Sequence, residues 1–175
     1  MADTPSASGR HDRILDAAAA AFGRGGYRGT PADDVARRAG LSKGALYWHF
    51  PGKAALLTGA VERLVAELEG TWDRVPLGDP RTALVAGMDA RIALLLDRPA
   101  ARGLLRAAGE EATTAARVAA LRDRDRDVLA MLLAAVAAPE VVDRRSLLRR
   151  AQALLALVDG LLAGADRDDG PDPRL

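Results

Sequence analysis

The sequence predicts an all-α protein, with a three-helix helix-turn-helix domain at the N-terminus and a C-terminal helical bundle. Alanine, leucine and arginine dominate its 175 residues, and β-branched residues are scarce. No segment shows the sustained alternation of apolar and polar residues that marks a half-buried strand. Glycine- and proline-containing breaks separate three short helical segments from several longer ones.

Composition excludes several kinds of site. The chain has no cysteine, which excludes disulfides, thiolate metal ligands and cysteine nucleophiles. With two histidines and no triad or metal-ligand spacing, we expect no enzyme, no cofactor and no metal. No apolar run reaches the ~18 residues that span a bilayer. The start MADTPSASGR lacks the apolar core of a secretory signal, so we expect a cytoplasmic protein without a membrane partner.

The first expected helix covers about residues 10–24. Its apolar residues repeat at helical spacing, and two consecutive glycines end it (Ile14, Ala18 and Phe22, then Gly25-Gly26). Residues 1–9 are rich in serine, proline and glycine, and we expect them to be disordered.

Two shorter helices are expected next. One covers about 31–39, with Thr30 as its N-cap, Pro31 at its first position and Gly40 after its end. Asp33 stands where a capping box places its acidic residue. The other runs to Phe50 from a Ser42 cap, and Pro51-Gly52 ends it.

Longer helices are expected beyond Lys53. They cover about residues 54–74, 81–97, 99–108, 112–138 and 141–165, with a linker over RVPLGDP and a flexible tail at 166–175. The predicted domains are therefore a disordered N-terminus at 1–9, a helix-turn-helix domain at 10–53 with its motif at about 31–50, and a helical domain at 54–165.

The helix–turn–helix layout around Gly40 is typical of proteins that place their second helix in the DNA major groove. If Leu46 and Phe50 face inward, Lys43, Gly44, Tyr47 and Trp48 face outward. Lys43 and Lys53 are the only lysines, and residues 1–60 carry a balance of +3 against −2 for the remainder. A basic N-terminal region favours a polyanionic partner, although ordinary scatter of surface charge explains the totals nearly as well.

The stretch TPADDVARRAGLSKGALYWHFPGKAAL resembles the N-terminal domain of the tetracycline-repressor (TetR) family of bacterial transcription regulators, and RILDAAAAAFGRGGY resembles that family's first helix and Gly-Tyr turn. The resemblance covers about residues 10–57. It implies a homodimer on a palindromic double-stranded DNA operator and a C-terminal domain that binds an unidentified small-molecule effector and so releases DNA. It also implies a cytoplasmic, nucleoid-associated bacterial protein.

Carried over by position, the resemblance implies DNA contacts by Thr30, Lys43, Gly44, Ala45, Tyr47, His49 and Lys53. Pro31 departs from the usual Thr or Ser and Ala54 from the usual acidic residue, which puts the Thr30–Pro31 contact in doubt. A phosphate bound by both the ammonium and the helix N-terminus explains a cation at the start of a helix, so we expect Lys53 to contact the backbone. We expect Lys43 to reach a guanine edge or a phosphate. Trp48 stays unassigned.

The last expected helix is apolar over an unusually wide face. Repeats at spacing seven predict burial against both its own domain and a second copy. The predicted dimer interface contains Leu147, Ala151, Leu154, Leu155, Val158, Leu161 and Leu162. A central core helix in a monomer is the alternative.

An effector pocket would lie within residues 54–165. Trp72 is the only aromatic residue of that region, which favours a small or aliphatic ligand, and we name Trp72, Met88 and Ile92 as candidate lining. Plain core is the alternative for Met88 and Ile92.

Two acidic motifs need no ligand. RDRDRD at 122–127 lacks the glycine and glutamate of a calcium loop and predicts Arg/Asp pairs on a solvated helix. Glu110 and Glu111 predict helix-end contacts.

A ligand-responsive repressor is the first hypothesis for the function, and a sensing module with vestigial DNA contact is the second. An enzyme is disfavoured. The sequence does not distinguish a repressor from an activator.

Overall fold

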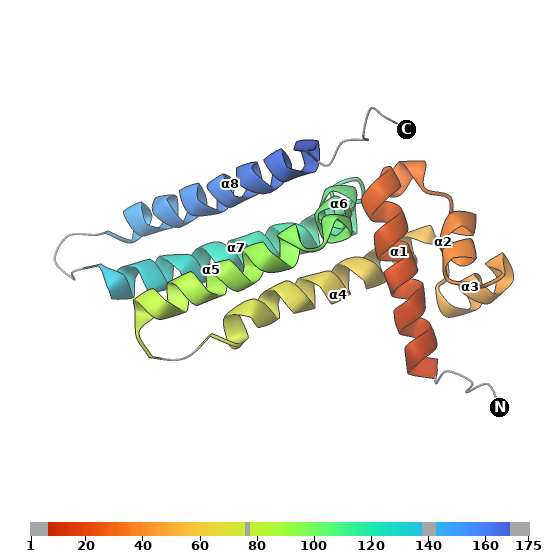
Figure 1. The fold of residues 1–175 in the computed structure, drawn as a ribbon, viewed down its shortest axis with the longest axis horizontal. Coiled ribbons are helices and arrows are strands. Elements are labelled where there is room, and N and C mark those ends of the chain that lie inside the picture. The colour runs from red at the N-terminus through yellow and green to blue at the C-terminus, as the bar shows by residue number, and fades with distance from the viewer. Residues whose placement is uncertain (1–6, 76–77, 138–142, 169–175) are drawn as a thin grey trace. The chain divides into compact units, whose positions relative to one another are not determined.

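The computed structural model describes residues 7–75, 78–137 and 143–168, and every regular element in them is an α-helix. Figure 1 shows the helices in chain order. They are α1 (Ala7–Gly29), α2 (Ala32–Arg38), α3 (Lys43–His49), α4 (Lys53–Asp73), α5 (Pro80–Leu96), α6 (Pro99–Ala108), α7 (Ala112–Val136) and α8 (Arg144–Asp168). The all-α prediction is confirmed.

Contacts divide the chain into two compact units. Among the described residues, unit 1 comprises those up to Ala66 together with Ala100–Val118, and unit 2 comprises Glu67–Pro99 and those from Ala119 onward. Unit 1 therefore contains α1, α2, α3 and α6 with the beginnings of α4 and α7. The domain boundary predicted after residue 53 stays a prediction. The flexibility predicted for the two ends also stays a prediction, since most of their residues lie outside the described ranges.

The interior of unit 1 is mostly aliphatic and contains two buried phenylalanines, Phe22 and Phe50. Side chains from α1, α2, α3 and α4 are fully buried in it, among them Ile14, Phe22, Val35, Leu46, Leu56 and Val61. α1 also meets α6 at two glycines, because a Cβ on Gly103 would lie 1.9 Å from the carbonyl oxygen of Gly23. The backbones of the two helices are thus in direct contact, which no larger residue at position 103 permits.

α1 does not stop at the Gly25-Gly26 pair. Gly26 adopts φ 69°, a left-handed conformation that breaks the helix, and a further helical turn follows up to Gly29. The predicted end at the glycine pair is therefore confirmed for the first part of α1, and only the further turn up to Gly29 was not predicted. α1 also begins at Ala7, inside the segment that was expected to be disordered; residues 1–6 lie outside the described part.

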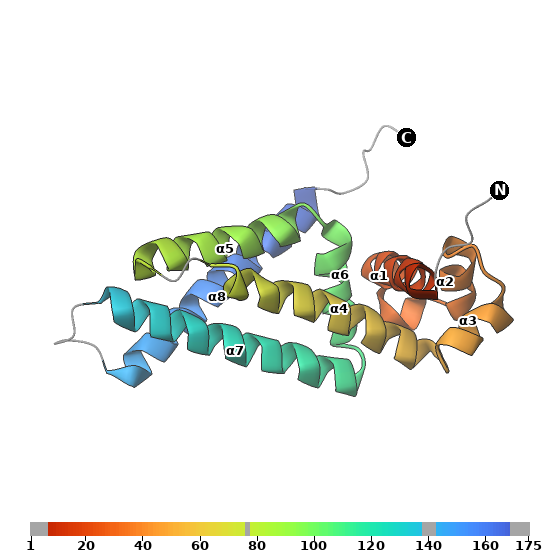
Figure 2. The same ribbon diagram turned by 90° about the horizontal axis from the view of Figure 1, so that it is seen from below.

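The helix-turn-helix agrees with the sequence prediction except at one cap. α1 lies beside α2, and α2 beside α3, in both views (Figures 1 and 2). Gly40, at φ 69°, makes the turn between α2 and α3, and the Leu41 N–H donates to the Ala36 carbonyl at 2.9 Å. Ser42 caps α3 as predicted, accepting from the Ala45 N–H at 3.2 Å.

The predicted cap at Thr30 is wrong. Pro31 is the N-cap of α2 and makes no side-chain cap hydrogen bond. Thr30 is buried, and its hydroxyl donates to the Gly26 carbonyl at 2.8 Å, with the Ala21 carbonyl at 3.2 Å. The hydroxyl thus compensates carbonyls that the break in α1 leaves open, instead of the N–H groups of α2.

Unit 2 packs around Trp72. The core cluster combines the indole with Leu129, Ala130, Leu147 and Ala151, so it joins α4, α7 and α8. Trp72 also lies directly against α5, since a Cβ on Gly87 would lie 2.3 Å from its ring. The region's single aromatic residue is therefore the centre of its core.

α8 buries one side within its own unit and exposes another. Of the residues predicted for a dimer interface, Leu147, Ala151 and Leu162 are buried in the single chain, and Leu154, Leu155 and Val158 are half-buried. Leu161 is 64% exposed, and so is its neighbour one turn earlier, Leu157, at 60%. Two exposed leucines one turn apart leave an apolar strip that no described part of the chain covers.

Candidate functional site

α3 divides into an inward and an outward face. Leu46 is fully buried, and Phe50, the C-cap of α3, is nearly so. His11 of α1 stacks on the Phe50 ring at a centroid distance of 4.7 Å. This packing fixes the rotation of α3 about its axis, as the apolar spacing predicts.

The outward face of α3 carries the predicted contact residues. Lys43 and Gly44 are exposed, Tyr47 is 39% exposed and Trp48 82% exposed. A Cβ on Gly44 would meet no atom within 4 Å, so this helix turn is open to an approaching molecule. An exposed tryptophan beside an exposed tyrosine and lysine is a surface suited to a planar, negatively charged partner.

Lys43 already has a partner in the free protein. Its Nζ lies 2.9 Å from Oδ1 of Asp33 on α2, and both side chains are 58% exposed. The hydrogen bond to Asp33 raises the pKa of Lys43, which further favours the charged ammonium. Asp33 therefore pairs with the third helix and does not complete a capping box on the second, which sequence reasoning missed.

Lys53 begins α4 and points back to the end of α1. Its Nζ donates to the Arg28 carbonyl at 3.3 Å and lies 4.6 Å from the centroid of the Tyr27 ring. The ammonium thus combines a hydrogen bond with a cation–π contact. His49 closes the outward face at the end of α3, with its ring edge-to-face on Trp48 at 4.8 Å.

Comparison with known proteins identifies this arrangement. Residues 14–60 match the family model described as bacterial regulatory proteins, tetR family. This segment of the chain is similar to the TetR family. The matched segment runs from α1 through α2 and α3 into α4, and so contains the outward face of α3 and both lysines. Family members and named relatives are transcription regulators rather than enzymes.

One relative and two solved structures illustrate the extent of the likeness. The transcriptional repressor KstR2 of Rhodococcus jostii is 33% identical over 92 residues, which are 53% of this chain and 41% of that protein. The chain thus spans less than half of that relative's length. A transcriptional regulator from Rhodococcus sp. Rha1 is 29% identical with a TM-score of 0.72, covering 89% of this chain and 82% of that one. A TetR-like regulator from Rhodococcus sp. RHA1 has a TM-score of 0.79 at 21% identity over 93% and 88%, a likeness of fold alone.

A glutamate far along the sequence also joins unit 1. Glu110, between α6 and α7, accepts from the Tyr27 N–H at 3.1 Å through Oε1 and from the Arg28 N–H at 2.9 Å through Oε2. These N–H groups, that of Arg28 first, hold the pKa of Glu110 below its ordinary value. Glu111 behaves as predicted for a helix end, because its carboxylate accepts from the Thr114 N–H at 2.9 Å in the first turn of α7.

Unit 2 contains a buried polar network that the sequence did not reveal. Asp125 is 1% exposed, forms an ion pair with Arg91 and accepts from the Trp72 Nε1–H at 3.0 Å. Arg91 also donates to the Leu68 carbonyl at 3.2 Å. The prediction of a solvated RDRDRD helix is therefore wrong for Asp125, although Arg126 and Asp123 do form the expected i, i+3 pair at 2.7 Å.

A cavity of ≈ 360 Å³ lies beside Trp72 in unit 2. Its walls are almost entirely apolar. They come from the end of α4, the start of α5 and from α7, with Val75, Ala83, Val128, Met131 and Leu132 among them. Met88 packs against the Trp72 core cluster and Ile92 is half-buried, and neither is among the residues that line this cavity.

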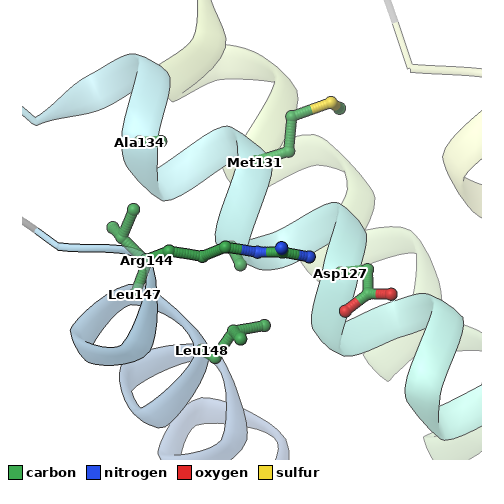
Figure 3. A pocket seen from close by; sticks show the side chains of 7 residues that line it. Asp127, Met131, Ala134, Arg144, Leu147 and Leu148 are labelled. Carbon is green, nitrogen blue, oxygen red and sulfur yellow. The ribbon is translucent and has the colours of Figure 1, made fainter.

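A second cavity, of ≈ 290 Å³, lies between α7 and α8. Figure 3 shows Arg144 of α8 extending across it toward Asp127 of α7, above Leu147 and Leu148. Within the described ranges, no three His, Asp or Glu side chains gather as a metal site would require. No helix of the same ranges is both long and apolar enough to cross a membrane.

Proposed function

We propose that this protein is a TetR-family transcription repressor that binds a palindromic operator as a homodimer and is released by a small-molecule effector. The observation that carries the DNA-binding part is the division of α3. Leu46 and Phe50 anchor the helix inward while Lys43, Tyr47 and Trp48 face outward. A second helix with its polar and aromatic side exposed is what a helix-turn-helix offers to the major groove.

The base-reading contacts come from the start of α3. Lys43 exchanges Asp33 for a guanine edge or a phosphate, and the exchange costs little because both charges are exposed. Gly44 lets the backbone approach the bases closely, and the Ala45 methyl can touch a thymine methyl. Good base contacts of this kind give about 1–3 kcal/mol of discrimination each.

The phosphate contacts flank that region. Tyr47 lies one turn after Lys43 on the same face, His49 ends the helix, and Lys53 begins α4 where a helix N-terminus favours an anion. Thr30 is omitted from the proposed surface, because it is buried and its hydroxyl already donates to the Gly26 carbonyl.

Dimerisation follows from the operator and from α8. Two half-sites are read by two recognition helices about 34–36 Å apart, which requires two copies. The exposed Leu157 and Leu161 give α8 an apolar strip for the second copy, and a Cβ on the intervening Gly160 would meet no atom within 4 Å. The proposed interface is therefore centred on Leu157 and Leu161, with the half-buried Leu154, Leu155 and Val158 at its edge.

The effector is proposed to occupy the cavity beside Trp72. Asp125 already binds the indole N–H, so the tryptophan offers the cavity only carbon atoms. An uncharged, apolar ligand suits such walls. To release the protein from the operator, the ligand must bind the conformation that does not bind DNA more tightly than the DNA-binding conformation, by several kcal/mol. Cytoplasmic location beside the nucleoid belongs to the same proposal.

Selection from a random pool of duplex DNA tests this function. We expect the full chain to enrich a palindrome whose half-sites lie about one helical turn apart. Sedimentation should then show two chains on each enriched duplex. Failure to enrich any sequence would leave α3 without its proposed partner and would favour the sensing module without DNA binding.

A further inference from the structure

We propose that Glu110 is a positioning residue for DNA binding: it holds the Tyr27–Arg28 segment that places Lys53. The inference rests on the proposed function, since it concerns the lysine assigned to the DNA backbone. All of these residues belong to unit 1, although Glu110 lies 82 and 83 residues along the chain from its partners.

The break in α1 creates the binding position for the carboxylate. Gly26 turns the chain at φ 69°, so the helical turn after it begins with N–H groups that have lost their partners in the preceding helix. The Glu110 carboxylate accepts hydrogen bonds from two of these N–H groups, one on each oxygen, and so binds the segment in a bidentate manner. Glycine is favoured at position 26 because a larger residue would be strained at φ 69° and because its Cβ would lie 2.7 Å from Glu110 Oε1, so the carboxylate would have to move.

Lys53 binds the same segment through a different set of atoms. Its Nζ donates to the Arg28 carbonyl and lies over the Tyr27 ring, so both residues that Glu110 holds by their N–H groups also position the ammonium. An ammonium has three N–H donors. One donor on Arg28 thus leaves others for a phosphate oxygen, and the hydrogen bond aims the lysine without consuming it.

Because Glu110 is negatively charged, positioning and simple charge repulsion predict opposite changes in DNA affinity when it is replaced. A carboxylate on a DNA-binding protein repels the phosphates, so its removal alone strengthens binding. If Glu110 positions Lys53, its removal weakens binding. Glu110→Gln keeps the shape but replaces one accepting oxygen by an NH₂ group, which cannot accept from a backbone N–H, so the bidentate contact is lost.

Glu111→Gln is the matched control. It removes the same charge from the next residue, whose carboxylate caps α7 through Thr114 and does not contact the Tyr27–Arg28 segment. On the duplex enriched by the wild type, we expect Glu110→Gln to bind about tenfold more weakly, as the loss of one charge-assisted contact does. We expect Glu111→Gln to bind as the wild type or slightly more tightly. Equal binding by both variants would overturn the proposal.

Two further measurements separate positioning from general loosening of the fold. The slope of log Kd against log salt should fall by about 0.9 in Glu110→Gln, because one phosphate contact is lost. In a Lys53→Ala background, Glu110→Gln should weaken binding no further. Additive losses, or an unchanged salt slope, would show that Glu110 does not act through Lys53.

Amide hydrogen exchange tests this bidentate contact without DNA. The Tyr27 and Arg28 amides should exchange faster in Glu110→Gln than in Glu111→Gln, while amides of the unit 1 interior keep their protection. Unchanged exchange of these two amides would contradict their hydrogen bonds to Glu110. If the wild type enriches no DNA sequence while this exchange difference is present, the proposed function fails and the contact between Glu110 and the Tyr27–Arg28 segment stands.

Discussion

Arg91 and Asp125 form an ion pair in the interior of unit 2, where the arginine is 7% exposed and the aspartate 1%. The aspartate also accepts from the indole of Trp72, and the arginine donates to the Leu68 carbonyl. Each charge is therefore both paired and hydrogen-bonded, which is the condition under which burial of an ion pair is tolerated. The network joins α4, α5 and α7.

Asp125→Ala should destabilise the protein by about 3–5 kcal/mol, because it leaves the Arg91 charge buried without its counter-ion. Asp123→Ala on the same helix removes an exposed i, i+3 partner of Arg126 and should change stability by at most about 0.5 kcal/mol. Urea unfolding followed by circular dichroism measures both. Similar midpoints for the two variants would contradict the importance of the buried pair.

Asp33→Asn should strengthen operator binding by more than Asp34→Asn. Both changes remove one negative charge from α2, but only Asp33 holds Lys43, whereas Asp34 pairs with Arg37 on its own helix at 2.8 Å. The difference between the two variants thus reports the release of Lys43. Anisotropy titrations on the enriched duplex measure it. Weaker binding by Asp33→Asn would mean that the aspartate orients the lysine instead of competing for it.

Gly44→Ala should separate stability from DNA binding. An added Cβ meets no atom within 4 Å, and alanine is favoured over glycine in a helix by about 1 kcal/mol, so the variant should unfold at a higher temperature. Operator binding should nevertheless weaken, because the methyl group stands between the helix backbone and the bases. A variant that is more stable and binds equally well would show that no close approach occurs at this position.

The cap of α5 should lose its effect in acid. Asp79 accepts from the Thr82 N–H at 2.9 Å, which, with the Thr82 hydroxyl, lowers the pKa of the carboxyl. A lowered pKa in the folded state means stabilisation above the unfolded pKa that disappears as pH falls through the folded value. Asp79→Ala should therefore lower the melting temperature at pH 7 and make less difference near pH 3. A pH-independent difference would contradict a role for the ionised carboxylate.

The helix-turn-helix could be predicted because its signals are local. Ser42 caps α3, Gly40 makes the turn and Leu46 faces inward, and each follows from residues within a few positions along the chain. The contacts that sequence reasoning missed join distant residues. Nothing in the pair Glu110-Glu111 distinguishes the residue that reaches the end of α1 from the one that caps its own helix.

Alternating charges misled the prediction for α7 for a physical reason. In RDRDRD, every second residue is acidic, and local pairing explains all of them equally well. Only the position of Trp72 and Arg91 on two other helices turns Asp125 inward. The Thr30 cap failed similarly, because the break at Gly26 left carbonyls for the hydroxyl that no cap rule anticipates.

The proposed DNA-binding surface on α3 and at the start of α4 is tested most directly by one binding experiment. Tyr47→Ala and Lys53→Ala, measured singly on the enriched duplex and on a duplex of scrambled sequence, remove two proposed phosphate contacts. Both variants should fold as the wild type and bind each duplex more weakly, with a salt slope reduced by about 0.9 per lost ionic contact for Lys53→Ala. Wild-type affinity in both variants would contradict the assignment of this face to DNA.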